Sequence, residues 1–339
     1  MLLVIVGHSE FAIGPSEYGL LRGQELALNV AGRVAVPLFL LLAGEHIGPR
    51  LLGNRAPGAS GVYVRRLATL FLGTTLFYWL VDIAKLARHR GLGPALTDYF
   101  ARQAADPAHL LLYGARPHLW FLVALMAVVV LAAFVLARAR VRTFVLASAA
   151  LYGVGLALGP YSSGAELQHG GVWLEWLLQS PLFFALGLFF GLERDNRPRD
   201  RMAWTLIAAG LAIHALEVYW ISSTHGVSPF RLAMLLGTVP YVAGAGMLAL
   251  SPEPTRVDRW LARFAGFVPV VYLIHIAFIE TLLPPRGRFP EVAVRVALPV
   301  MTILLSFASA ALLGRLWMRV RRLRRRSSAE PPAAMPAVP

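Results

Sequence analysis

Eight ionisable side chains lie inside, or near the end of, stretches that are otherwise apolar. A charge there costs several kcal/mol on insertion scales, so each group needs a partner, a water-filled cavity or a function. An imidazole in such a place is either a packed core residue or, because its pKa lies near neutral pH, a general base. The groups are His8, Glu45, His46, Asp82, His214, Glu217, His275 and, nearer a helix end, Glu280.

Most of these groups also have a purely structural explanation in a neighbour one helical turn away. A pair of opposite charges on one helix face can satisfy itself, and a charge near a helix end can extend to the membrane surface. The structural explanations are Asp82 with Lys85, His214 with Glu217, and Glu45 and His46 close to Arg50.

Composition places these residues in a membrane protein. Of the 339 residues, 57% are hydrophobic and 15% charged, with a mean hydropathy of +0.62, whereas soluble domains are about a quarter charged. The chain has no cysteine, which excludes disulfides, thiolate catalysis and Cys-ligated metals. The net charge of +14 would indicate nucleic acid in a soluble protein, but the distribution of arginine argues for a lipid bilayer instead.

Nine stretches of about twenty mostly apolar residues and one shorter stretch predict an all-α transmembrane bundle of about ten helices. Most of the Lys and Arg residues fall in alternate loops, which the positive-inside rule assigns to the cytoplasm together with both termini. A membrane domain over 1–315 is expected, followed by a tail over 316–339 that is first basic, facing anionic lipid headgroups, and then Pro/Ala-rich and disordered. The stretches are 1–14, 33–52, 67–87, 117–137, 141–160, 175–193, 203–221, 232–250, 264–283 and 292–314.

The segment "GARPHLWFLVAL" enters the membrane from the outer side. Arg116 and His118 make a wet, cationic mouth there, which suits a hydroxylated or anionic acceptor. Trp120 belongs to the same mouth, although a tryptophan at this depth is also expected in an interfacial aromatic belt. The preceding loop, 85–117, is long enough to form a lid over an acceptor.

Several segments, in their order and spacing, resemble acyltransferase family 3, the integral membrane O-acyltransferases that modify bacterial surface polysaccharides. The matching segments are "VIVGHS", "RVAVPLFLLLAG", "YVRRLATLFL", "HLWFLVAL" and "VYLIHIAF". The resemblance covers the chain from residue 1 to about 315. It implies that acyl-CoA, usually acetyl-CoA, is the donor substrate on the cytoplasmic side, that no cofactor is bound permanently, and that the acceptor is a glycan hydroxyl on the other side.

The resemblance also implies that the histidine of the first helix, His8, is catalytic. A neutral imidazole can remove the proton of the acceptor hydroxyl while that oxygen attacks the thioester. His275 matches a second recurrent position of the family, where it would orient the acceptor or shape the cavity. Glu45 is expected to be a charge partner for a histidine or arginine, and no metal site is expected.

Two departures from the family pattern bear on the site. The family has an arginine eleven positions before the catalytic histidine, and the stretch 1–14 spans only about 21 Å against a hydrocarbon core of about 30 Å. We therefore expect a truncated first helix and an upstream start that encodes this arginine. The family's R-x-x-R pair, which would bind the phosphates of coenzyme A, is here Arg66 followed by Thr69, with Arg65 as the substitute cation; ordinary positive-inside charge is the other interpretation.

The sequence therefore predicts a multi-pass O-acyltransferase of the bacterial inner membrane, without indicating an oligomeric state. One other hypothesis is a transporter or flippase of a glycan or lipid-linked precursor, in which the same buried charges relay protons. Another is a non-catalytic scaffold descended from the family, which Thr69 and the missing arginine favour.

Overall fold

The computed structural model describes residues 1–13, 19–52, 56–162, 172–193, 200–229, 232, 234–250, 256–285 and 288–327. Within these ranges every regular element is a helix, so the predicted all-α class is confirmed. The chain divides into two compact units. The first is formed by Met1–Gly14 and Pro254–Pro339, and the second by Pro15–Glu253.

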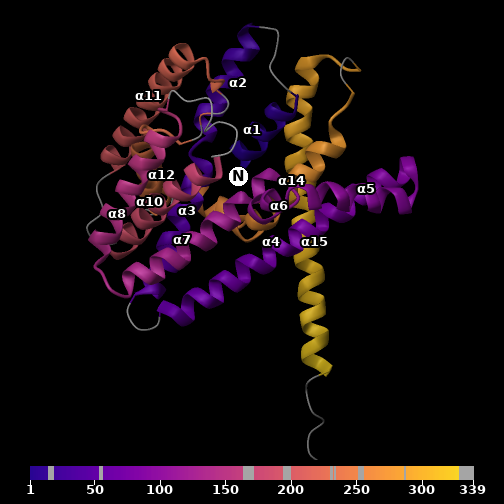
Figure 1. Cartoon of the computed structure of the whole chain (residues 1–339), viewed down its shortest axis with the longest axis horizontal. Coiled ribbons are helices and arrows are strands. Elements are labelled where there is room, and N and C mark those ends of the chain that lie inside the picture. Colours follow the sequence, from indigo (N-terminus) through magenta and orange to yellow (C-terminus); the bar gives the residue numbers. More distant parts are fainter. Residues whose placement is uncertain are drawn as a thin grey trace, which may run out of the picture. The chain divides into compact units, whose positions relative to one another are not determined.

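The first unit joins the two ends of the chain. It contains α1 (Leu2–Ile13), α13 (Arg256–Ala262), η6 (Ala265–Phe267), α14 (Val268–Leu282) and the long α15 (Glu291–Ser327), drawn in indigo, orange and yellow in Figure 1. Helix α15 continues through the basic segment 316–327, so the expected boundary at 315 lies inside a helix. The Pro/Ala-rich end, 328–339, lies outside the described residues.

The second unit begins with α2 (Gly19–Gly32), α3 (Ala35–Ile47) with the one-turn η1 (Gly48–Leu51), and α4 (Ala56–Arg90). The expected outer loop 85–117 is itself helical: α4 extends to Arg90 and is followed by α5 (Leu92–Ala105), α6 (Pro107–Tyr113) and η3 (Pro117–Leu119). The segment expected to form an acceptor lid is thus built mainly from two helices, and α5 places Tyr99 on a buried face.

The rest of the second unit comprises α7 (Trp120–Leu136), α8 (Val141–Leu158), α10 (Val172–Leu192), α11 (Asp200–His225) and α12 (Thr238–Ala249). Helix α10 packs against both α3 and α8, α4 packs against α7, and α11 packs against α12. Each of the ten predicted apolar stretches coincides with one α-helix or lies within one, and three of them also include a one-turn 3-10 helix.

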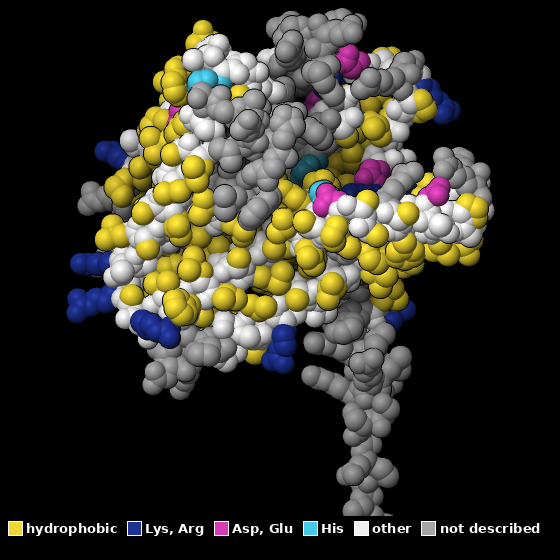
Figure 2. Space-filling model, viewed as in Figure 1, with side chains coloured by type: hydrophobic (Ala, Val, Ile, Leu, Met, Phe, Trp, Pro, Cys, Tyr) yellow, Lys and Arg dark blue, Asp and Glu magenta, His cyan; other side chains and the backbone are white. Residues whose placement is uncertain are grey.

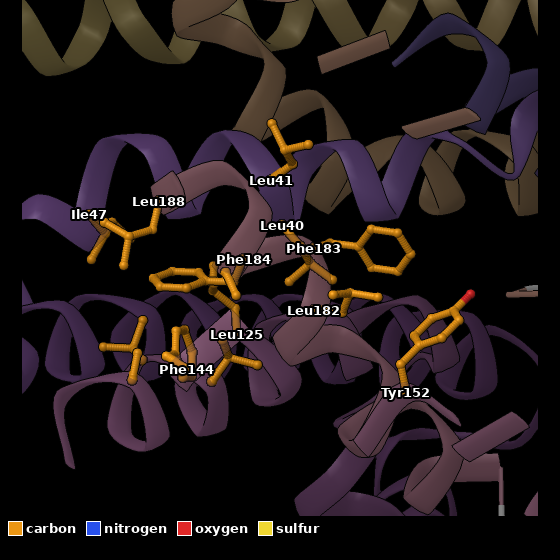
Figure 3. Close-up of a cluster of buried hydrophobic side chains, with 14 of the residues drawn as sticks. Leu40, Leu41, Ile47, Leu125, Phe144, Tyr152, Leu182, Phe183, Phe184 and Leu188 are labelled. Carbon is orange, nitrogen blue, oxygen red and sulfur yellow. The ribbon is translucent and has the colours of Figure 1, made fainter. Parts of the chain in front are cut away.

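The core of the second unit lies where α3, α7, α8 and α10 meet, and its side chains interdigitate in Figure 3. Phe183, Phe184, Leu40 and Leu41 are fully buried there. Two glycines bring α3 and α10 together: a methyl group on Gly187 would overlap the carbonyl of Leu41, and one on Gly44 the carbonyl of Phe184. Small residues allow this close backbone approach between membrane helices.

The exterior suits a lipid environment. Figure 2 shows hydrophobic side chains over most of the visible face, with Lys and Arg mainly at its margins. Leu146 and Leu216 are about 70% exposed, which would be costly in water. Seven helical stretches in the described part of the chain are long and apolar enough to cross a membrane, and the shorter Trp176–Leu192 and Thr238–Ala249 are also apolar. The polytopic bundle is confirmed, and the count of ten helices stays a prediction.

Candidate functional site

Helices α1, α14 and α15 enclose the two predicted catalytic histidines in the first unit. They pack around a layer formed by Ile5, Val271 and Ala310. One turn along α14 from that layer, His275 is fully buried. Its ring centroid lies 5.2 Å from that of His8 on α1, with the planes tilted by 48°. Two positions separated by more than 260 residues, both expected from the family resemblance, are thus in contact.

A hydrogen bond fixes the orientation of the His275 ring. Its Nδ1 lies 2.7 Å from the carbonyl oxygen of Tyr272, one turn earlier on α14. Because a carbonyl only accepts, Nδ1 must carry the hydrogen, and Nε2 of the neutral ring is then the acceptor nitrogen. This tautomer leaves one acceptor nitrogen on the His275 ring.

Three hydroxyl side chains are fully buried in the same unit. Ser9 follows His8 on α1, while Thr302 and Ser306 lie on the buried face of α15 that also carries Ala310. Their oxygen atoms have no hydrogen-bond partner among the described residues. Buried polar groups are nearly always paired, so this interior is polar enough to receive a ligand atom or water.

A charge cluster closes the other end of the α1–α15 contact. Arg295 is buried and binds the carboxylate of Glu10, two residues after His8. Its Nε also donates to Glu291 Oε1 at 2.7 Å, one turn earlier on α15. Sequence reasoning missed both Glu10 and Arg295, although each is a charged residue inside a predicted apolar stretch and could have been found by that signal.

Arg116, a predicted acceptor residue, makes an ion pair in the second unit. Its guanidinium donates to both oxygens of Asp82, at 2.6 and 2.8 Å, and lies 4.8 Å from the centre of the Tyr78 ring. The hydroxyl of Tyr99 donates to Asp82 at 3.3 Å; burial and, second, the Asp82 charge raise the pKa of Tyr99, so it remains a donor. This network joins α4 and α5 to the segment that leads through η3 into α7.

The other two predicted acceptor residues flank that ion pair. His118 is buried, with its ring edge-on to Tyr78 at 5.7 Å. Trp120 is half-buried and stacks on Trp176 of α10, with centroids 4.1 Å apart and an interplanar angle of 29°. Tyr113 meets the Trp176 ring edge-on at 5.8 Å. The structure thus adds Trp176 and Tyr113 to this end of the unit, and the tryptophan at the start of the stretch 175–193 was the signal that sequence reasoning left unused.

The predicted donor residues lie at the other end of the second unit. Arg65 and Arg66 are exposed on α4, and Thr69 donates to the carbonyl of Arg65 at 2.8 Å. Asp82, on the same helix, is sixteen residues after Arg66, which corresponds to about 24 Å at 1.5 Å per residue. The two predicted substrate-binding regions are therefore separated by most of a membrane's thickness.

Glu45 belongs to the second unit, whereas His8 and His275 belong to the first. Its side chain is half-buried on α3 and packs close to Gly191 of α10. The one-turn η1 follows α3 and contacts both α10 and α4, so Glu45 lies toward the end of the unit where α4 begins.

His214 and Glu217, expected to satisfy each other, each bind another element. His214 Nδ1 lies 3.1 Å from Thr238 Oγ1. The Glu217 carboxylate accepts from the backbone N–H groups of Leu236 and Gly237, at 3.0 and 2.8 Å, just before α12 begins. A carboxylate is favoured at a helix N-terminus, so both groups hold α11 against α12. In the described part of the chain no three His, Asp or Glu side chains converge as a metal site requires.

Comparison with known proteins agrees with the resemblance. The family model described as "Acyltransferase domain", of acyltransferase family 3, matches residues 1–313 of the 339. No curated protein matches the chain, and no solved structure does.

Proposed function

Because the chain belongs to acyltransferase family 3, we propose that it is an O-acyltransferase that moves an acyl group, usually acetyl, from cytoplasmic acyl-CoA to a hydroxyl of an extracytoplasmic glycan or related acceptor. The family match makes it a membrane acyltransferase; the donor, the acceptor and the bacterial inner membrane with cytoplasmic termini belong to the proposal. The contact between the rings of His8 and His275 carries it.

In this proposal His8 is the general base. Its ring takes the proton of the acceptor hydroxyl while that oxygen attacks the carbonyl carbon of the thioester. The new C–O bond forms, the C–S bond breaks, and the leaving thiolate takes up the proton to give free coenzyme A. His275 touches the ring of His8 and is held by Tyr272, so we assign it the orientation of His8 or of the acceptor hydroxyl.

The substrates are assigned to opposite ends of the second unit. Arg65 and Arg66 are exposed and are proposed to bind phosphates of coenzyme A, with Glu45 as a charge partner for an arginine at that end. The acceptor is proposed to approach the end that carries Arg116, His118 and Trp120. Since Arg116 already binds Asp82 with both arms of its guanidinium, we propose that it supports this surface and that Trp120 contacts the acceptor.

The direct test is release of coenzyme A by the purified protein supplied with acetyl-CoA and an acceptor glycan. The chain contains no cysteine, so a thiol reagent reports coenzyme A without background from the protein. We expect His8→Ala and His8→Gln to abolish release, since general-base catalysis contributes about 10²–10⁴-fold. His46→Ala, at an exposed position of α3, is the matched control and should remain active.

The same experiment separates the other hypotheses. A transporter or flippase releases no coenzyme A, with or without acceptor. A scaffold releases none either, and its His8→Ala variant leaves the surface glycans of the cell unchanged. Replacing acetyl-CoA with succinyl-CoA identifies the acyl group.

A further inference from the structure

A cavity of about 240 Å³ lies in the second unit, between the turn that joins α7 to α8 and the end of α10. None of the residues that form it has a role in the proposed function. Gly48 of η1 packs against Leu188, one residue before the cavity wall begins. Because η1 also contacts α7 and α4, and α4 begins five residues after η1 ends, the cavity lies toward the end of the unit where α4 begins. The lining residues are Arg140, Val141, Arg142, Phe189, Leu192 and Glu193.

The charge of the cavity favours an anion. Two arginines, Arg140 and Arg142, and one acidic residue, Glu193, line it, and all three are exposed, which leaves an excess of positive charge. A guanidinium presents a planar fork of N–H donors that matches two oxygens of a phosphate, and such charge-assisted pairs are about twice as strong as neutral hydrogen bonds.

The backbone adds donors of the same kind. Arg140 precedes α8 in an extended conformation, with φ −74° and ψ 156°, and no side chain caps the helix. The first hydrogen bond of the helix runs from the Phe144 N–H to the Arg140 carbonyl. The N–H groups of Val141, Arg142 and Thr143 therefore have no acceptor within α8, and the helix dipole attracts negative charge to this point.

The volume of the cavity and the residues that line it limit which ligands can bind there. Pockets that enclose a drug-sized molecule measure roughly 300–1,000 Å³, so a cavity of about 240 Å³ holds one group of a larger molecule. Phe189 and Leu192 provide an apolar wall beside the arginines. We propose that this cavity binds the phosphate ester of an amphiphilic or nucleotide ligand, with Arg140 and Arg142 as its ligands.

Two molecules can bring that group to this end of the unit. One is the nucleotide part of coenzyme A, in which case the cavity is a donor subsite that rests on the proposed function. The other is the headgroup of an anionic phospholipid, which would bind whatever reaction the protein performs. The two sources share the phosphate and differ in the group esterified to it, a nucleoside or a diacylglycerol, so a binding experiment can separate them.

The test uses the full-length protein purified in an uncharged detergent, with two probes: adenosine 3′,5′-bisphosphate and dioctanoyl phosphatidylglycerol. Binding is measured by calorimetry for the wild type and for the double variant Arg140→Gln/Arg142→Gln. Arg138→Gln is the matched control, because Arg138 is exposed in the same turn but its guanidinium lies 4.5 Å from the Phe134 ring and donates to the Phe134 carbonyl. Unchanged thermal unfolding of all variants verifies that they are folded.

We expect the double variant to lose at least tenfold in affinity for one probe, and the control to keep wild-type affinity. A loss for the bisphosphate assigns the cavity to the donor, and a loss for the lipid assigns it to the membrane. The proposal is overturned if neither probe binds the wild type, or if the double variant and Arg138→Gln bind alike. Because binding is measured without turnover, this result is independent of whether the protein transfers an acyl group.

Discussion

The guanidinium of Arg116 binds both oxygens of the Asp82 carboxylate, although 34 residues separate the two in the chain. The pair is mostly buried, with side-chain exposures of 14% and 18%. It ties the last turns of α4 to the segment that leads into α7. Arg116 therefore has a structural role that its place in a cationic mouth did not predict.

This pair predicts that Asp82→Asn destabilises the protein about as much as Arg116→Gln. Removing one partner of a buried ion pair costs about 3–5 kcal/mol, and the partial exposure here places our expectation near the lower end of that range. Thermal unfolding in detergent measures it, with Arg88→Gln at an exposed position of α4 as the control. If Arg116 only binds acceptor, Asp82→Asn will unfold like the wild type.

Pairs of residues that lie far apart in the chain, such as Asp82 and Arg116, could not be predicted from the sequence. The apolar stretches are local signals, because crossing a membrane requires about twenty apolar residues in a row, and each predicted stretch contains a helix. By contrast, α2 and α5 contain too many polar residues to give that signal. The partners of Asp82, His214 and Glu217 lie in other segments of the chain, so a rule that searches one turn of the same helix cannot find them. The resemblance to a family gave His8 and His275 each a role, but it did not predict that their rings lie in contact.

The contact between α3 and α10 predicts that Gly187→Ala is destabilising. The added methyl group would overlap the Leu41 carbonyl, and overpacking typically costs about 1–3 kcal/mol. Gly153→Ala is the matched control: it lies in α8, and a methyl group there meets nothing within 4 Å, so it should gain roughly 0.5–1 kcal/mol from helix propensity. Equal melting temperatures for the two variants would contradict the packing described for Gly187.

The buried hydroxyls of α15 predict that removing one of them does not lower the stability of the protein. Thr302→Val keeps the shape of the side chain but removes an oxygen that has no hydrogen-bond partner among the described residues. An unsatisfied buried polar group costs about 1–3 kcal/mol, so we expect the unfolding free energy to stay constant or rise by about 1 kcal/mol. Thr281→Val, whose hydroxyl donates to the Ala277 carbonyl at 2.6 Å, provides the comparison. A marked loss of stability in Thr302→Val would reveal a partner for its hydroxyl.

The stacked tryptophans predict a role for Trp176 in acceptor binding. Removing its ring leaves Trp120 without its stacking partner, and such pairs are worth about 0.5–1.5 kcal/mol beyond area burial. We expect Trp176→Ala to raise the KM for a glycan acceptor several-fold while acetyl-CoA hydrolysis without acceptor is unchanged. Trp204→Ala, at a position of α11 that is 60% exposed, should change neither rate. If the substitution changes only the rate of acetyl-CoA hydrolysis, Trp176 does not contribute to acceptor binding.

The first unit has a consequence for biosynthesis. Helix α1 is made before α14 and α15, which begin at Val268 and Glu291, so the surroundings of His8 form only after most of the residues between them have been made. At about 5–20 residues per second, that interval is roughly 15–60 s. During this time a short apolar segment carrying His8 and Glu10 has no Arg295 to neutralise it. The site where chemistry is proposed is consequently completed last, and a ribosome that stalls before Glu291 leaves an incomplete one.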